Sequence, residues 1–215
     1  MKVLELFAGS RSIGKVAEEL GYEVFSTDVN NFDGIDYVVD ILNFDINKIP
    51  FAPDIVWASP PCTAFTVARI GINWHKDHTP KTEKAKFGLK LVEKTLDIIN
   101  KINPKYYYIE NPRGKLRKLD VVKGLPRTTV WYCKYGDTRA KPTDIWTNNL
   151  KSIFNPNGWL PRSECFNGNK NCHHEAAPRS SRTGTQGLKG NYESFLNFKK
   201  RGHIVESCKE RFLFN

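Results

Sequence analysis

Two reactive side chains stand out because each follows a short apolar run: the thiol of Cys62 and the carboxylate of Glu110. Cys62 comes directly after two prolines, which fix φ twice and stiffen the chain. A thiolate is a nucleophile, and a carboxyl group in a buried setting can move a proton. The pair therefore predicts covalent catalysis with acid–base assistance. An inert buried cysteine, and an ion pair between Glu110 and Arg113, are the alternatives.

A parallel sheet is expected to bring these two side chains to one edge. Residues 53–58 and 105–110 are β-prone runs, and residues 84–102 between them have helical periodicity. Strands joined by such crossovers lie parallel, and ligands bind at their carboxyl ends. The long polar stretch 63–84 follows Cys62 directly. We interpret it as a lid that closes on an anionic ligand.

The amino-terminal residues predict a strand–helix–strand unit over residues 3–27. The turn Phe7-Ala8-Gly9-Ser10 begins its helix, and Asp28 follows its second strand. This arrangement suits a nucleoside cofactor, because backbone can approach the ligand and an acid can bind ribose hydroxyls. Asp40 and Ile41 are candidates for contact with an adenine. Ordinary turns with solvated or capping aspartates are the alternative at both places.

The amino-acid composition of the chain changes after a predicted β-hairpin at residues 126–148. The following segment is rich in Asn, Gly, Pro, Ser and Arg and has little periodicity. We therefore expect three parts: a catalytic domain at 1–136, a small irregular subdomain at 137–192, and a carboxyl-terminal segment at 193–215 that packs back on the first domain.

The composition favours an intracellular partner of negative charge. The 33 Lys and Arg residues exceed the 23 Asp and Glu residues, and the net charge of +10 favours a nucleic acid. The odd number of cysteines, five, argues against a disulfide framework and for a reducing compartment. We see neither a signal peptide nor a membrane span. The expected location is the cytoplasm of a bacterial or phage-infected cell.

Three stretches occur in the same order as in the cytosine-5 DNA methyltransferases: LELFAGSRSIG (4–14), SPPCTAF (59–65) and IENPRG (109–114). The resemblance covers residues 2 to about 133. The later segments GDTRAKPTDIWTN (136–148) and APRSSRTGTQGLKG (177–190) are more similar to the short, phage-type members. The resemblance implies a doubly wound, mostly parallel α/β sheet of the Rossmann-like class. It also implies S-adenosylmethionine as methyl donor, DNA as substrate, and target recognition by the subdomain at 137–192.

The resemblance also implies residue roles. Cys62 would attack C6 of an extruded cytosine, and Glu110 would hold the base edge and protonate N3. Arg127 would be the first arginine of a Gln-x-Arg-x-Arg motif, whose second arginine is Thr129 here. The residues expected to bind the donor are Phe7, Ala8, Gly9, Ser10, Arg11, Ser12, Asp28, Val29, Asp40, Ile41, Ser59 and Pro60. The residues expected to bind DNA are Pro61, Arg69, Lys76, Lys81, Asn111, Arg113, Arg139 and Arg182.

Several departures from the family pattern require alternative assignments of residues, donor and function. Arg127, Arg139 or Thr129 would have to replace the missing arginine. Arg11 stands where small residues are usual, which suits a donor with an extra carboxylate, carboxy-S-adenosylmethionine. Cationic neighbours such as Arg69 or Arg113 are expected to lower the pKa of the Cys62 thiol. A catalytically weak DNA-binding relative, and an enzyme acting on a nucleotide or RNA, are the alternative functions.

The irregular subdomain contains a partial metal motif, Cys165-x6-Cys172-His173-His174. Thiolates and imidazoles are the ligands that Zn²⁺ prefers, and a metal would stabilise a segment with little apolar surface. We name Cys165, Cys172 and His173 as zinc ligands, with Cys133 as a further ligand if the hairpin folds back. Free thiols and surface histidines are the alternative.

Overall fold

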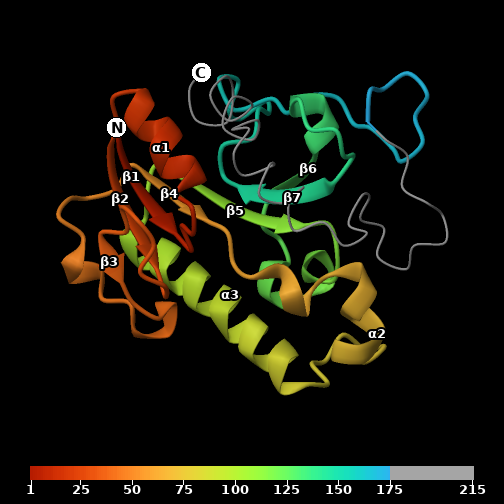
Figure 1. The fold of residues 1–215 in the computed structure, drawn as a ribbon, viewed down its shortest axis with the longest axis horizontal. Helices are drawn as coiled ribbons and strands as arrows, with labels where there is room; N and C mark the ends of the chain where they lie inside the picture. Colours follow the sequence, from red (N-terminus) through yellow and green to blue (C-terminus); the bar gives the residue numbers. More distant parts are fainter. Residues whose placement is uncertain (175–215) are drawn as a thin grey trace.

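The structure, a computed structural model, describes residues 1–174 and centres on a seven-stranded sheet (Figure 1). The strand order is β3-β2-β1-β4-β5-β7-β6. Neighbouring strands from β3 to β5 are parallel, whereas β7 is antiparallel to both β5 and β6. The strands are β1 (Lys2–Leu6), β2 (Glu23–Asp28), β3 (Tyr37–Val38), β4 (Ile55–Ala58), β5 (Tyr106–Pro112), β6 (Arg127–Trp131) and β7 (Pro142–Thr147).

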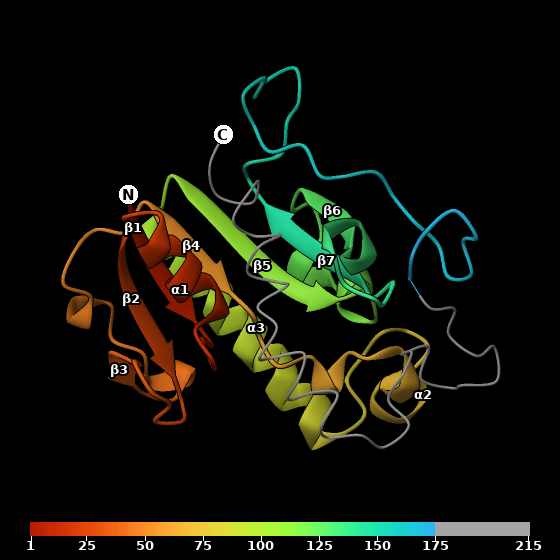
Figure 2. The same cartoon turned by 45° about the horizontal axis from the view of Figure 1, so that its top comes forward.

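Helices cover both faces of this sheet (Figure 2). The α-helices are α1 (Ser12–Glu19), α2 (Ile70–Asn73) and α3 (Glu83–Ile102). Short 3-10 turns are η1 (Ile41–Asn43), η2 (Ile46–Lys48), η3 (Cys62–Ala64), η4 (Val67–Arg69), η5 (Leu116–Lys118), η6 (Asp120–Val122) and η7 (Tyr132–Tyr135). The predicted doubly wound, mostly parallel α/β fold is confirmed. Among the described residues no helix is both long and apolar enough to cross a membrane.

Alternation along the strands divides the apolar side chains between two cores. Leu4 and Leu6 of β1 pack on the face that α3 covers, together with Val92 of that helix. Val3, the intervening residue, packs on the opposite face with Val16 of α1. Because successive strand residues point to opposite faces, a strand buried on both sides is apolar almost throughout. The central strands are therefore held from both sides.

The main sheet extends beyond the predicted boundary at residue 136. β7 pairs with β5 from Tyr108↔Thr147 to Pro112↔Thr143, so it is an interior strand. The predicted hairpin is present, but β7 places it in the catalytic sheet and not in a separate subdomain. The predicted carboxyl-terminal segment at 193–215, and Arg182, lie outside the described residues.

The segment at 63–84, predicted as a lid, is partly folded onto the core. The rings of Phe65 and Trp74 stack with centroids 5.8 Å apart, and both side chains are buried. The indole N–H of Trp74 donates to the carbonyl oxygen of Ala64 at 2.8 Å. A long loop without its own packing was expected, but two aromatic side chains fasten this one.

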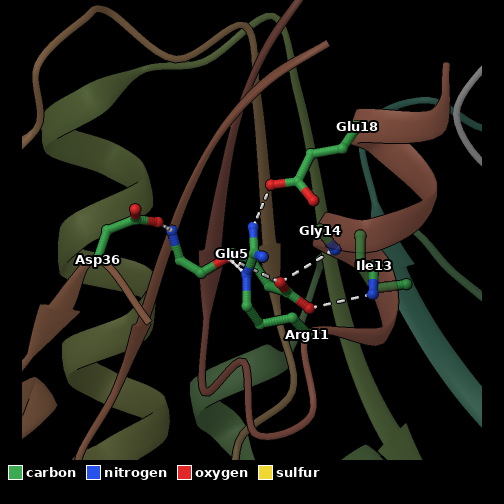
Figure 3. Close-up of polar contacts among 7 residues, drawn as sticks. Glu5, Arg11, Ile13, Gly14, Glu18 and Asp36 are labelled. Atoms are coloured by element: carbon green, nitrogen blue, oxygen red, sulfur yellow. Dashed lines mark hydrogen bonds and ion pairs between the residues drawn. The ribbon is translucent and has the colours of Figure 1, made fainter. Parts of the chain in front are cut away.

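Helix α1 is capped by a side chain from β1 (Figure 3). The residue before the helix, Arg11, has φ 56° and makes no side-chain cap. Instead the buried carboxylate of Glu5 accepts the backbone N–H groups of Ile13 at 3.1 Å and Gly14 at 3.0 Å. A Cβ atom at position 14 would lie 2.7 Å from Glu5 Oε2, so a larger residue there would displace the capping carboxylate. The capping therefore ties the first strand to the first helix.

We predict an unusual pH dependence of stability from Glu5. Burial raises the pKa of this carboxyl group to about 7, against the opposing effect of its hydrogen bonds and of Arg11. Between about pH 4.5 and 7 the folded protein then holds a proton that the unfolded chain has released. The stability that Glu5 contributes therefore falls as pH rises through this window, by up to roughly 3 kcal/mol.

Urea unfolding of the wild type and of Glu5→Gln at pH 5 and pH 8 measures this contribution. The free-energy difference, wild type minus variant, is expected to shrink at the higher pH. The exposed Glu23, changed to Gln in the same way, is the control. A difference that grows with pH would mean that the hydrogen bonds outweigh the cost of burial.

Candidate active site

The carboxyl ends of three neighbouring parallel strands define the candidate site. β4 lies between β1 and β5, with Leu6↔Ala58 and Ala58↔Ile109 in register. Glu110 directly follows Ile109, and Cys62 follows β4 after a short loop. The turn that starts at Phe7 leaves the same edge of the sheet. The three matched sequence stretches thus meet at one edge, as strand polarity requires.

The loop that carries Cys62 is fixed by Asn111. The buried amide of Asn111 donates from Nδ2 to the carbonyl oxygen of Pro60 at 2.9 Å. At the start of the loop, the hydroxyl of Ser59 accepts the indole N–H of Trp57 at 3.0 Å. Asn111 was expected to bind DNA, but its side chain points into the protein and holds the loop. It is therefore a positioning residue for Cys62.

Two glycines let neighbouring segments approach the Cys62 loop closely. The N–H of Lys115 donates to the carbonyl oxygen of Phe65 at 2.7 Å. A Cβ atom at Gly114 would lie 2.3 Å from that same oxygen. A Cβ atom at Gly88 of α3 would lie 2.7 Å from the Cβ of Ala64. The loop is therefore held between α3 and the segment that follows β5.

Glu110 is oriented by Tyr132 of η7. The phenol O–H donates to Glu110 Oε1 at 3.0 Å. Burial raises the pKa of Glu110, while the charge of Lys141 and the hydrogen bond from Tyr132 act in the opposite direction. Asp144 of β7 raises this pKa further. The carboxyl group therefore keeps its proton to higher pH than an exposed glutamate does.

Lys141 joins the site although the sequence analysis assigned it no role; it lies in the segment 136–148. Its ammonium group lies 4.4 Å from the ring centre of Tyr132, and its charge acts on both Cys62 and Glu110. Burial raises the pKa of the Cys62 thiol, the charge of Glu110 raises it further, and Lys141 opposes both. The expected lowering of this pKa by Arg69 or Arg113 is therefore wrong. Both arginines are exposed.

The remaining residues predicted to contact substrate fall into two groups. Arg127 is exposed at the start of β6, and Arg139 pairs with Asp137 at 2.9 Å. Thr129 exchanges hydrogen bonds with Arg117 and Asp144 at 2.8 Å each, so its hydroxyl is already engaged. Neither Arg127 nor Thr129 has a described contact with Glu110 or Cys62. The second group consists of the residues predicted to bind DNA that are exposed to solvent: Pro61, Arg69, Lys76, Lys81 and Arg113.

The turn after β1 has the open backbone that a nucleoside donor needs. Phe7 and Gly9 adopt φ 58° and 52°, and a Cβ atom at Gly9 would meet no atom within 4 Å. The Gly9 N–H donates to Asp28 Oδ2 at 3.0 Å, and the next residue, Val29, is 62% exposed. Ala8 in this turn and Pro60 in the Cys62 loop are buried, while Ser10 is exposed. This edge of the sheet therefore combines the carboxylate of Asp28, the exposed apolar side chain of Val29 and the open backbone at Gly9.

Three predicted donor contacts are placed differently. Ile41 is 5% exposed within the core, so it offers no surface to an adenine. Asp40 caps η1 by accepting the N–H of Leu42 at 2.9 Å. Arg11 pairs with Glu18 (Figure 3) and also donates from Nε to Ser26 Oγ at 3.0 Å. Ser12 begins α1 and shares a hydrogen bond with Ser10 at 3.1 Å.

A cysteine–histidine cluster includes Cys133 of η7. Cys133, Cys165, Cys172 and His174 place their ligand atoms within 4.8 Å of one another. Two of the three predicted metal ligands, Cys165 and Cys172, belong to it. The prediction of His173 is wrong, because its Nε2 contacts the carbonyl oxygen of Asp137 at 3.0 Å. The histidine of the cluster is the next residue along the chain.

We predict that two substitutions shift the reactivity of Cys62 in opposite directions. Lys141→Met removes the cation and raises the pKa of Cys62, whereas Glu110→Gln removes the anion and lowers it. The pH profile of iodoacetamide labelling, followed by mass spectrometry of the Cys62 peptide, measures both changes. Lys76→Met, at an exposed position, is the control. Shifts in the same direction would contradict the assigned geometry.

The comparisons with known proteins agree on one family. Residues 1–121 match the family model for C-5 cytosine-specific DNA methylase. A probable DNA (cytosine-5)-methyltransferase of Frog virus 3 (isolate Goorha) is 33% identical over 156 residues, which cover 69% of this chain and 71% of that protein.

A solved structure supports the fold. It is a putative DNA modification methyltransferase encoded within a prophage of E. coli, with a TM-score of 0.52 and 13% identity. The match covers 78% of this chain, and the chain spans 52% of that longer protein. From the family match and the viral relative together, the chain belongs to the C-5 cytosine-specific DNA methylases.

Proposed function

We propose that this protein transfers a methyl group from S-adenosylmethionine to C5 of cytosine in DNA, through a covalent bond between Cys62 and C6. One observation carries the proposal: the thiol of Cys62 follows β4, the carboxyl group of Glu110 lies near the end of the adjacent parallel strand β5, and the charge of Glu110 raises the pKa of Cys62, with Lys141 acting on both groups. Family membership makes cytosine in DNA the expected substrate.

The chemistry requires a nucleophile and a proton donor at two positions of one ring. The Cys62 sulfur bonds to C6 and gives up its proton, which pushes the C5–C6 electron pair onto C5. Glu110 protonates N3 and so neutralises the charge that develops on the base. C5 would then accept the methyl group of the donor, whose sulfur keeps the bonding pair and leaves as a neutral thioether. Water, which also takes the thiol proton in the first step, takes the C5 proton as the C5–C6 double bond re-forms. The Cys62 sulfur then leaves as a thiolate, and N3 returns its proton to Glu110. A pKa raised by burial suits Glu110 for donation.

The charges of the site link these two proton transfers. An ionised Glu110 raises the pKa of Cys62, so the resting site disfavours two anions together. A base whose N3 hydrogen-bonds to a protonated Glu110 keeps that carboxyl group neutral. Lys141 then has one anion to stabilise, the thiolate. The nucleophile thus forms when the base is present.

The edge of the sheet near Gly9 and Asp28 has groups that suit S-adenosylmethionine. When bound, this donor would supply a methyl group that its positively charged sulfur activates. Asp28 would accept ribose hydroxyls, and the exposed Val29 would pack on the adenine. The open backbone at Gly9 leaves room for the ligand. The unmodified donor is favoured over carboxy-S-adenosylmethionine, because Glu18 and Ser26 already engage the Arg11 guanidinium.

A DNA-binding relative with weak or no transfer activity is the second candidate. Thr129 stands where the family has an arginine, and its hydroxyl is held by Arg117 and Asp144. Such a protein would bind DNA with a steep salt dependence but transfer no methyl group to DNA, RNA or dCMP. Assays with these three substrates and labelled donor separate the candidates.

We predict that Cys62 is the point of covalent attachment. An oligonucleotide with 5-fluorocytosine keeps a fluorine where the C5 proton should leave, so the adduct is trapped. The wild type is expected to form a denaturation-resistant complex, located at Cys62 by mass spectrometry, and Cys62→Ala is expected to form none. Full methyl transfer by Cys62→Ala would reject the mechanism.

We predict that substitutions of Glu110 and of its partner Tyr132 reduce methyl transfer to different extents. Glu110→Gln loses the proton donor, and methyl transfer is expected to fall by on the order of 100-fold or more. Tyr132→Phe keeps the ring and loses one hydrogen bond to Glu110, so roughly a tenfold loss is expected. Single-turnover rates on DNA measure both, with donor binding by each variant as the control. Equal rates for Glu110→Gln and wild type would contradict the assigned role.

A further inference from the structure

The cysteine–histidine cluster gathers four ligand atoms from two distant segments. Cys133 lies on η7, directly after Tyr132, whereas Cys165, Cys172 and His174 follow β7. All four ligand atoms lie within 4.8 Å of one another. Cys165 Sγ lies 3.8 Å from His174 Nδ1. A tetrahedron with arms of about 2.3 Å has edges of about 3.8 Å, so small adjustments suffice to enclose one ion.

Burial and hydrogen bonding distinguish this cluster from surface thiols. Cys133, Cys165 and His174 are 2%, 6% and 7% exposed. The amide of Asn169 donates to Cys165 Sγ at 3.5 Å, and its backbone carbonyl accepts the N–H of Cys172 at 3.1 Å. The chain between the two cysteines is thus turned back on itself. Within the described part of the chain, the buried His174 Nε2 has no hydrogen-bond partner.

The segment around these ligands has little else to hold it. Between β7 and residue 174 the described chain contains no helix or strand. Trp159 anchors its first part, because it is 5% exposed and packs edge-on against Tyr108. Nearer the ligands, Leu160 and Phe166 face solvent, 65% and 62% exposed. The buried apolar atoms near the cluster come mainly from Trp131, Ala140 and the cysteines themselves. Metal coordination commonly replaces a core in segments of this kind.

We propose that Cys133, Cys165, Cys172 and His174 bind one Zn²⁺ ion as a structural Cys₃His site. Three thiolates and one imidazole in tetrahedral reach are the ligand set that zinc prefers over the hard cations. Four protein ligands leave no open position, so the ion serves structure and not catalysis. This inference does not depend on the proposed methyl transfer.

The site would fasten the connection that positions Glu110. Tyr132, whose O–H binds Glu110, immediately precedes the ligand Cys133. The N–H of Asp137 donates to the Tyr132 carbonyl oxygen at 3.2 Å, and His173 contacts the Asp137 carbonyl oxygen. A metal bound to Cys133 would therefore restrict the neighbouring Tyr132, whose side chain orients the carboxyl group of Glu110. We expect metal removal to loosen this connection.

The first test uses the full chain, produced without chelators and desalted. Elemental analysis is expected to find about one zinc per chain. Protein refolded with Co²⁺ in place of zinc is expected to show intense visible bands of tetrahedral cobalt and a sulfur-to-cobalt charge-transfer band. Zinc well below one equivalent together with absent cobalt bands, or a disulfide among these cysteines in freshly isolated protein, would overturn the proposal.

Matched variants identify the ligands. His174→Ala is expected to lose the charge-transfer intensity of one ligand or the metal itself, whereas His173→Ala is expected to keep both. Cys165→Ser is expected to weaken binding more than tenfold in a chelator competition, whereas Cys62→Ala, outside the cluster, is expected to bind as the wild type does. Retention of wild-type zinc affinity by both His174→Ala and Cys165→Ser would refute the assigned ligand set.

Discussion

The close contact between the Cys62 loop and the segment after β5 is the constraint on which the rest of the site depends. Asn111 holds the carbonyl oxygen of Pro60, and Lys115 holds that of Phe65. Gly114 permits this approach because a Cβ atom there would overlap the Phe65 carbonyl oxygen. Since β5 also carries Glu110, one strand sets the positions of both reactive groups. Their relative placement is therefore a property of the sheet more than of a flexible loop.

The charges of the site favour a single anion. Lys141 supplies one positive charge near two groups that can each become negative, Cys62 and Glu110. Burial penalises ionisation of both, and the ionised carboxylate makes the thiolate less favourable. Ionisation of Glu110 therefore raises the pKa of the Cys62 thiol. In the proposed mechanism, a base that binds a neutral Glu110 would leave Lys141 to the sulfur, which would connect recognition of the base to activation of the nucleophile.

Local sequence patterns were sufficient to predict the amino-terminal part of the fold. The apolar runs, the turn after β1 and the periodicity of α3 each depend on neighbours within a few residues, so they are legible in the sequence. Lys141 and Tyr132 were missed because their place depends on β7 inserting beside β5, a pairing between distant segments. The antiparallel direction of β7 brings its beginning to the end of β5, and no spacing motif reports that.

The roles of adjacent residues were also hard to distinguish from the sequence alone. His173 and His174 are chemically alike, and the Asp137 carbonyl oxygen decides which of them turns towards the cysteines. Ile41 was assigned to a ligand on the strength of its type, but burial in the core removes it from any surface. Family resemblance identifies a position, whereas tertiary packing decides the direction of its side chain. Asn111 illustrates this, because it lies in the matched motif yet binds protein backbone.

The insertion of β7 between β5 and β6 has a consequence for how the molecule is made. The ribosome releases Cys62 and Glu110 well before the β6–β7 hairpin, and amino-terminal parts of a chain commonly organise first. Until the hairpin docks, β5 has an unpaired edge, and the thiol lacks its neighbouring ammonium group. A nascent or interrupted chain would therefore carry the thiol and the carboxyl group without the Lys141 ammonium group or the Tyr132 hydroxyl beside them. The site would be complete only after β7 pairs with β5.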